Sequence, residues 1–198
     1  MLTVAIQAGG ESRRMGQDKA LLPFLDRPLI VRVLERLKPL ADEILVTTNR
    51  PQAYQFLGVP LYPDQQPGRG ALGGLYTALS AASHPLVAVV ACDMPFVSLA
   101  LLEGLRDTLL NTRADLAIPL TAGGSEPFHA VYRRLTCLPP LQQALEAGNW
   151  RVDSWFNQVQ LYPLPPEEIR RYDPDGLCFW NINTPEELKA AQQLAERL

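Results

Sequence analysis

The sequence predicts an α/β protein, a three-layer sandwich in which helices cover both faces of a mainly parallel central sheet. Short runs of apolar and β-branched residues alternate with longer segments whose leucines and valines recur at helical spacing. The centres of these short runs are continuously apolar, as expected for strands that are buried on both faces. Strands and helices also follow one another singly, an order that joins parallel strands through crossover helices.

In the first part of the chain, strands are predicted at residues 2–6, 43–49, 85–93 and 115–119. Amphipathic helices are predicted at residues 28–40, 71–83 and 98–110. Pro28 suits the first turn of its helix because its fixed φ is compatible with helical geometry. Ser98 is a good N-cap because its hydroxyl can accept a hydrogen bond from a backbone N–H of the first turn.

The rest of the chain is less regular. Residues 127–135 are predicted as a strand that leads into a helix, and residues 158–164 and 177–183 as two further strands. The last helix has the clearest start, with Thr184 as N-cap, Pro185 at the first position and Glu187 completing a capping box. No linker interrupts these elements, so residues 1–198 are expected to form a single domain.

Composition excludes several classes of protein. A net charge of −3 argues against binding to nucleic acid. Three cysteines without a CxxC pair and only two histidines argue against a structural zinc site, and they favour a reducing compartment. The sequence contains no apolar run of membrane-spanning length and no signal sequence, so we expect a cytoplasmic protein without a membrane partner.

The strongest functional signal is the stretch QAGGESRRMGQDKALL, residues 7–22, which directly follows the first predicted strand. Gly9 and Gly10 allow a tight turn whose N–H groups can point at an anion, and Arg13 and Lys19 add positive charge. The carboxyl end of a parallel strand is where such sheets bind ligands, so a nucleotide phosphate is the expected partner. The spacing matches neither the Walker A motif nor the dinucleotide-binding fingerprint.

Within this stretch, AGGESRRMGQDKALL resembles AGGxSxRMGxDKxLL, the signature of nucleotidyltransferases that activate small phosphorylated metabolites. Along nearly its whole length the chain most resembles the molybdenum cofactor guanylyltransferase family. The resemblance implies a Rossmann-like sheet, GTP as the donor, Mg²⁺ as the cofactor and the phosphate of molybdopterin as the acceptor. It also implies a nucleotide-binding half, residues 1–120, and an acceptor-binding half, residues 121–198.

The resemblance implies roles for individual residues of the first half. Lys19, Arg13 and Asp93 are the expected catalytic residues, and Asp93, from the string VVACDMPF, is the expected Mg²⁺ ligand. A carboxylate at the end of a buried strand is costly unless it is paired or binds a metal, although an aspartate there could also cap a helix. The expected nucleotide contacts are Gln7, Ala8, Gly9, Gly10, Lys19, Asn49, Asp64 and Asp93.

The strings WRVDSWF (150–156) and FWNINTPEEL (179–188) extend the resemblance into the second half and imply acceptor contacts from Arg151, Asn181 and Asn183. Two positions depart from the family pattern. Ala71 replaces a proline, and Glu126 stands where a histidine or arginine often precedes the proline of the PFHAVYRR segment.

We therefore expect transfer of GMP from GTP to molybdopterin, with release of pyrophosphate. Three alternatives stay open: CTP as the donor, a sugar or polyol phosphate as the acceptor, and a nucleotide-binding adaptor protein without catalytic activity. The expected partners are the two substrates, together with molybdoenzymes or their chaperones.

Overall fold

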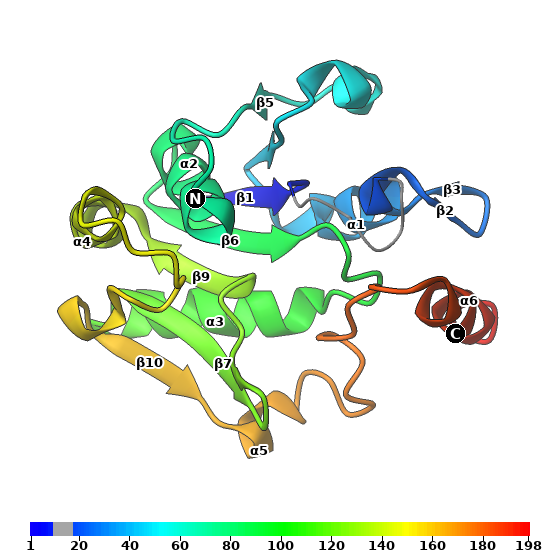
Figure 1. Ribbon diagram of the computed structural model, residues 1–198. Coiled ribbons are helices and arrows are strands. Elements are labelled where there is room, and N and C mark those ends of the chain that lie inside the picture. The colour runs from blue at the N-terminus through cyan, green and yellow to red at the C-terminus, as the bar shows by residue number, and fades with distance from the viewer. Residues whose placement is uncertain (10–17) are drawn as a thin grey trace.

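The computed structural model describes residues 1–9 and 18–198 of the chain (Figure 1). In these residues an eight-stranded sheet has the order β10-β7-β9-β6-β1-β4-β5, with β8 paired to β7, and β2 and β3 form a separate two-stranded hairpin. The strands are β1 (Leu2–Gln7), β2 (Pro23–Phe24), β3 (Arg27–Pro28), β4 (Glu43–Thr47), β5 (Leu61–Tyr62), β6 (Leu86–Ala91), β7 (Leu116–Thr121), β8 (Gly124–Ser125), β9 (His129–Arg133) and β10 (Leu161–Leu164).

The centre of the sheet is parallel. β1 pairs in parallel with β4 on one side and with β6 on the other, so that Ile6 lies opposite Val46 and Val90. The pairs β4–β5 and β7–β10 are also parallel, whereas β9 runs antiparallel to both β6 and β7. The predicted class, an α/β fold around a mainly parallel sheet, is confirmed.

Helices cover both faces of this sheet. They are α1 (Leu29–Leu37), α2 (Gly70–Ala81), α3 (Leu99–Asn111), α4 (Arg134–Glu146), α5 (Pro166–Ile169) and α6 (Pro185–Ala195). Short 3₁₀ turns are η1 (Lys19–Leu21), η2 (Lys38–Leu40), η3 (Pro51–Leu57) and η4 (Phe156–Gln158). Leucines of α1 and α3 share one buried cluster, and leucines of α2 and α4 share another. The described helices include none that is both long and apolar enough to cross a membrane.

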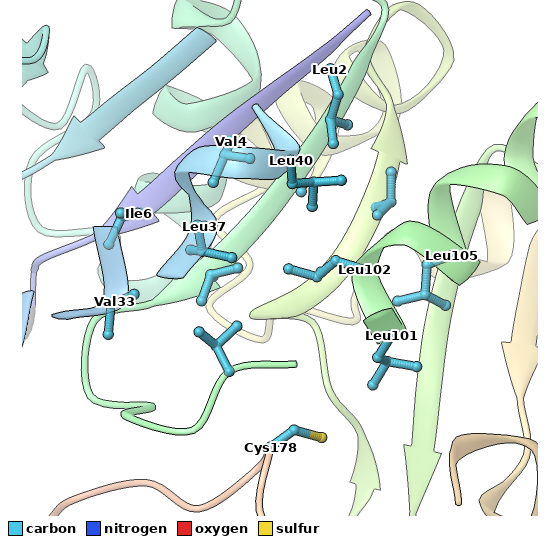
Figure 2. Close-up of a cluster of buried hydrophobic side chains, with 14 of the residues drawn as sticks. Leu2, Val4, Ile6, Val33, Leu37, Leu40, Leu101, Leu102, Leu105 and Cys178 are labelled. Carbon is cyan, nitrogen blue, oxygen red and sulfur yellow. The ribbon is translucent and has the colours of Figure 1, made fainter. Parts of the chain in front are cut away.

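All six residues of β1 are buried because both of its faces are covered. Leu2, Val4 and Ile6 pack in the cluster formed by α1 and α3, as Figure 2 shows. The intervening residue Ala5 belongs to the opposite cluster with α2 and α4. A strand that is buried on both faces needs no alternation of apolar and polar residues, so the continuous apolar run was sufficient to predict it.

The carboxyl ends of the central strands meet at one edge of the sheet. In Figure 1 the arrows of β1 and β6 point toward the side of the molecule where the β2–β3 hairpin and α6 lie. Lys19 on η1 follows β1 in the chain, and Asp93 comes two residues after the end of β6. The topology therefore collects polar side chains from distant parts of the sequence at this edge.

The prediction of a strand at residues 177–183 is wrong. The N–H of Ile182 donates to the carbonyl of Asp93 at 3.0 Å, and no strand is assigned to the segment. Its apolar residues are buried in different places, Cys178 with the α1–α3 cluster and Ile182 beside the β2–β3 hairpin. An irregular segment that buries two apolar residues, Cys178 and Ile182, thus resembled a strand in the sequence.

The helix after this segment begins as predicted. The hydroxyl of Thr184 accepts the N–H of Glu187 at 3.1 Å, and the Glu187 carboxylate accepts the N–H of Thr184 at 3.0 Å. The same carboxylate accepts the N–H of Asn183 at 2.6 Å. The capping box of α6 therefore also holds the backbone of a predicted acceptor contact.

Candidate active site

A cavity of about 420 Å³ opens at the carboxyl edge of the sheet. Its described lining residues come from the ends of β1 and β6, from η1, from the start of α2, and from the segments that precede β9 and α6. They are Gln7, Ala8, Gly9, Asp18, Lys19, Gly70, Ala71, Ala91, Cys92, Asp93, Met94, Glu126, Phe128 and Asn181. Gly10 and Arg13, both predicted site residues, lie outside the described residues.

Lys19 is the central cation of the described cavity. Its Nζ donates to Oδ1 of Asn183 at 2.7 Å and lies 3.8 Å from Oδ2 of Asp93. The Lys19 and Asp93 side chains are only 18% and 23% exposed, so solvent screens this pair less than it would a surface pair. Three predicted site residues from widely separated parts of the chain thus meet at one ammonium group.

Asp93 is positioned by backbone hydrogen bonds on both sides. The N–H of Cys92 donates to the carbonyl of Gln7 at 3.0 Å, and the carbonyl of Asp93 accepts from Ile182. Burial raises the pKa of the Asp93 carboxyl, and the nearby Lys19 opposes that shift without cancelling it. A carboxylate with this balance gains stability from any further cation that enters the cavity.

Asp18 also lines the cavity, and the sequence analysis assigned it no role. Its carboxylate accepts the N–H of Ala20 at 3.2 Å, which caps η1, and it binds the guanidinium of Arg50 and the hydroxyl of Tyr54. Burial and the hydrogen bond to Asp18 raise the pKa of Tyr54, which therefore remains a neutral donor. These contacts anchor the turn that carries Lys19. The sequence feature that could have predicted this role is the position of Asp18 directly before Lys19.

The end of β1 provides a polar floor. Gln7 is 9% exposed, and its Nε2 atom is buried without a hydrogen-bond partner among the described residues. Gly74 makes room for this side chain, because a Cβ at that position would lie 3.0 Å from Nε2. A buried amide without a partner is unfavourable, so a polar ligand in the cavity would relieve a cost that is already present.

The first turn of α2 faces the same cavity through Gly70 and Ala71. Arg69, the N-cap residue, makes no side-chain capping bond, and the first turn contains no acidic residue. Uncapped N–H groups and the helix dipole favour an anion here. Ala71 replaces the proline expected from the resemblance, and unlike proline it carries a backbone N–H.

Asn49 and Asp64 are brought together but are not among the described lining residues of the cavity. Asn49 follows β4, and its Nδ2 donates to Oδ2 of Asp64 at 2.8 Å. The N–H of Asp64 donates back to Oδ1 of Asn49 at 3.0 Å. The two predicted nucleotide contacts therefore form one reciprocal pair beyond β1, on the side of the sheet away from β9.

The predicted acceptor contacts separate into two places. Asn181 lines the cavity and Asn183 binds Lys19, whereas Arg151 is not among the described lining residues. The Arg151 guanidinium forms a bidentate pair with Asp153, at 3.0 and 2.7 Å, and the Arg151 side chain is 83% exposed. Sequence similarity located Arg151 on the chain without indicating that it would lie outside the described lining of the cavity.

His129, to which no catalytic role was assigned, is fully buried and does not line the cavity. Burial lowers its pKa to about 4, so the ring is neutral at physiological pH. Its ring lies edge-on to Phe179, with 5.2 Å between the ring centroids. Glu126 and Phe128, from the segment that leads into β9, do line the cavity.

Known proteins resemble this chain over most of its length. The family model described as a MobA-like NTP transferase domain matches residues 4–160. A molybdenum cofactor guanylyltransferase of Desulfosudis oleivorans is 34% identical over 196 residues, which cover 96% of this chain and 94% of the relative. A probable molybdenum cofactor guanylyltransferase of Chloroflexus aggregans is 36% identical over 198 residues, with 97% and 94% covered.

The fold is also similar to that of a solved structure. The crystal structure of molybdopterin-guanine dinucleotide biosynthesis protein A from Archaeoglobus fulgidus matches with a TM-score of 0.86 and 27% sequence identity. The match covers 99% of this chain and 100% of the other. The likeness therefore includes the segments on both sides of the cavity.

Replacing the Asp93 carboxylate should stabilise the ligand-free protein. Because the pKa of Asp93 is raised by folding, its ionised form opposes folding once the pH exceeds the ordinary value of 3.8. Asp93→Asn should raise the melting temperature by a few degrees at pH 7, and the gain should shrink as the pH falls toward that ordinary value. Thermal unfolding measured across this pH range checks the sign.

Asp107→Asn is the matched control, because Asp107 is an exposed residue of α3 paired with Arg106. It should change the melting temperature little at any pH. A lower melting temperature for Asp93→Asn at pH 7 would show instead that attraction to Lys19 outweighs the burial of the carboxylate.

Proposed function

This chain belongs to the MobA-like NTP transferase family, and from that membership we propose that it transfers GMP from GTP to the phosphate of molybdopterin, releasing pyrophosphate. The curated relatives, which carry the name molybdenum cofactor guanylyltransferase and cover nearly the whole chain, favour this activity over the alternatives. The structural observation that carries the proposal is that Lys19 and Asp93 line one cavity and that Asn183 binds the Lys19 ammonium group there.

The reaction is a substitution at phosphorus. An oxygen of the acceptor phosphate forms a bond to the α-phosphorus of GTP, and the bond between that phosphorus and the bridging oxygen to the β-phosphate breaks. The acceptor phosphate is largely ionised near neutral pH, so the protein has little need of a general base. Its contribution is to align the two phosphates and to offset charge that moves toward pyrophosphate.

The described cavity contains groups suited to these tasks. Lys19 would offset the developing negative charge, because its ammonium group is already held between two segments of the site. The backbone at Gly9 is open, since a Cβ there would meet no atom of the described residues within 4 Å, and it would let a phosphate approach the main chain closely. Gln7 and the N-terminus of α2 add donors from the same side. The predicted contributions of Gly10 and Arg13 belong to the undescribed loop.

The residues present also suit Mg²⁺. The described residues hold no group of three or more histidine, cysteine or acidic side chains that could bind a metal unaided. A single protein carboxylate is nevertheless typical of Mg²⁺ bound together with nucleotide phosphates and water, and the desolvated Asp93 is the carboxylate available. When bound, Mg²⁺ supplies charge neutralisation and orientation of phosphate oxygens.

The acceptor would bind on the β9 and α6 side of Asp93, where Asn181 and Asn183 lie, and the nucleoside on the side of Asn49 and Asp64. Arg151 would contact a more distant part of the acceptor, because its side chain is exposed and paired with Asp153. We further propose a cytoplasmic setting, for which the three free cysteines are suited, and molybdoenzymes or their chaperones as recipients of the product.

The first experiment is a pyrophosphate-release assay with the purified chain, molybdopterin and Mg²⁺. GTP should support release that depends on molybdopterin, while CTP and ATP at the same concentration should support at least about tenfold less, because discrimination between bases through hydrogen bonds readily exceeds that factor. Equal or greater turnover with CTP would assign the chain a different donor. Nucleotide binding without turnover would favour an adaptor.

Lys19→Ala tests the role of the central cation. Turnover at saturating GTP should fall by about 10²–10³-fold, the usual loss when one charged donor to the transition state is removed. The binding of GTP should weaken much less if Lys19 acts mainly on the reacting phosphates. Lys189→Ala, on the exposed surface of α6, is the control and should keep full activity. Unchanged turnover for Lys19→Ala would remove Lys19 from the mechanism.

Asp93→Asn tests the proposed metal ligand. Loss of outer-shell groups alone weakens metal affinity by about 10–100-fold, so loss of a direct ligand should raise the Mg²⁺ concentration for half-maximal activity at least as much. Asp64→Asn serves for comparison, since Asp64 lies outside the described cavity and should leave the Mg²⁺ dependence in place. An Asp93→Asn enzyme with the wild-type Mg²⁺ curve would exclude Asp93 as the ligand.

A further inference from the structure

Glu126 and Phe128 line a part of the cavity that belongs to the predicted acceptor-binding half, residues 121–198, but neither the sequence pattern nor the proposed mechanism gives either residue a specific role. They lie on the segment that leads into β9, and the N–H of Ala91 at the end of β6 donates to the carbonyl of Phe128 at 3.1 Å. β9 and β1 flank β6 on opposite sides, so this pair borders the cavity from one side of β6, and Gln7 at the end of β1 and Gly9 just after it border the cavity from the other side. A ligand bound here would therefore be separated from the nucleoside side of the site.

The Glu126 carboxylate is held in place by its surroundings. Its Oε1 accepts from the hydroxyl of Thr121 at 3.0 Å, and the Thr121 hydroxyl accepts from the N–H of Gly123 at 3.1 Å. The backbone of Glu126 is fixed at both ends, with its N–H on the carbonyl of Pro119 at 3.0 Å and its carbonyl on the N–H of His129 at 3.1 Å. The two backbone hydrogen bonds and the hydrogen bond from Thr121 thus restrict the position of the carboxylate.

The environment of this carboxylate favours hydrogen-bond donors. Burial raises the pKa of Glu126, and the hydrogen bond from Thr121 only partly opposes the shift. Thr121 engages one carboxylate oxygen, which leaves the second oxygen able to accept from a ligand. Two adjacent N–H donors would bind such a group well, whereas the phosphate of the acceptor would be repelled by it and would be attracted to Lys19.

Phe128 supplies an apolar surface beside the carboxylate. Its ring packs against the buried cluster formed by α2 and α4 while also lining the cavity. Pro127 and Phe128 form the turn that the His129 N–H to Glu126 carbonyl bond closes, and Glu126 and Phe128 both line the same cavity, so one ligand can contact both residues. A flat heterocycle with N–H groups on one edge matches an aromatic wall next to a carboxylate.

We propose that Glu126 and Phe128 bind the pterin ring of the acceptor, with the carboxylate of Glu126 accepting from the ring N–H and the 2-amino group and the ring of Phe128 forming the apolar wall. The inference rests on the proposed function. The same 2-amino-4-oxo edge also occurs on guanine, but the predicted nucleoside contacts Asn49 and Asp64 lie beyond β1, on the other side of β6. Glu126 would thereby place an anionic group before Pro127, where the family often has a histidine or arginine, and this group would recognise the pterin ring through its N–H groups.

Glu126→Gln is the main test, because the amide keeps the size of the side chain but loses its charge and one of its two acceptors. The KM for molybdopterin should rise by about 10-fold or more, since a hydrogen bond to a charged group contributes that much to affinity. The KM for GTP should stay within about twofold if the side chain does not contact the nucleotide. Glu167→Gln, on the exposed surface of α5, is the matched control and should leave both values unchanged.

A binding measurement tests the subsite without catalysis. Fluorescence titration with free 6-hydroxymethylpterin should give weaker binding to Glu126→Gln and to Phe128→Leu than to the wild type, and GTP should bind all three alike. Thermal unfolding verifies that both variants are folded. Unchanged pterin affinity in both variants would overturn the subsite, as would a loss confined to GTP, which would assign the carboxylate to guanine.

The outcomes separate this inference from the proposed function. If the wild-type chain releases no pyrophosphate from GTP and molybdopterin, the proposed function fails. If the wild type is active and Glu126→Gln keeps the wild-type KM for molybdopterin, the function stands and only the pterin subsite is overturned.

Discussion

The site depends on one interaction, the position of the Lys19 ammonium group between Asp93 and Asn183. Its partners come from the end of β6 and from the segment before α6, so a single side chain connects the early, middle and late parts of the sequence. The carbonyl of Asp93 also accepts from Ile182, which places the anionic group and the C-terminal segment in register at the sheet edge. Any displacement of one partner would change the environment of the other two.

This arrangement has an energetic cost that is consistent with a binding site. Burial raises the pKa of Asp93 although Lys19 is near, and Gln7 presents a buried amide nitrogen without a described partner. Groups that serve only to stabilise a fold are normally satisfied within it, whereas these two would be better satisfied with a cation and a polar ligand in the cavity. Asp18 differs, because Arg50 and Tyr54 already bind its carboxylate and make it a support for η1.

The strand order of the sheet explains how two substrates could bind at one cavity and contact different residues. Asp93 follows β6 in the middle. On one side, Gln7, Asn49 and Asp64 lie at or after the ends of β1, β4 and β5, and on the other side Glu126 and Phe128 precede the antiparallel β9. A parallel β9 would have placed the start of that strand at the opposite edge. The one central antiparallel strand therefore supplies a wall of the cavity that a purely parallel sheet would lack.

The α/β class, the buried strands, the capping box of α6 and the family could be predicted from the sequence, because they depend on periodicity, capping and motifs that involve residues close together in the chain. Three features could be seen only in the folded chain: residues 177–183 form no strand, Asn183 binds Lys19 from 164 positions away, and Arg151 is exposed and paired with Asp153. The folded chain also shows that Asp18 and Glu126 line the cavity. Contacts between distant residues follow from the order and direction of the strands, which no local sequence pattern specifies. A short apolar stretch such as residues 177–183 can be buried by a strand or equally well by an irregular segment between two clusters.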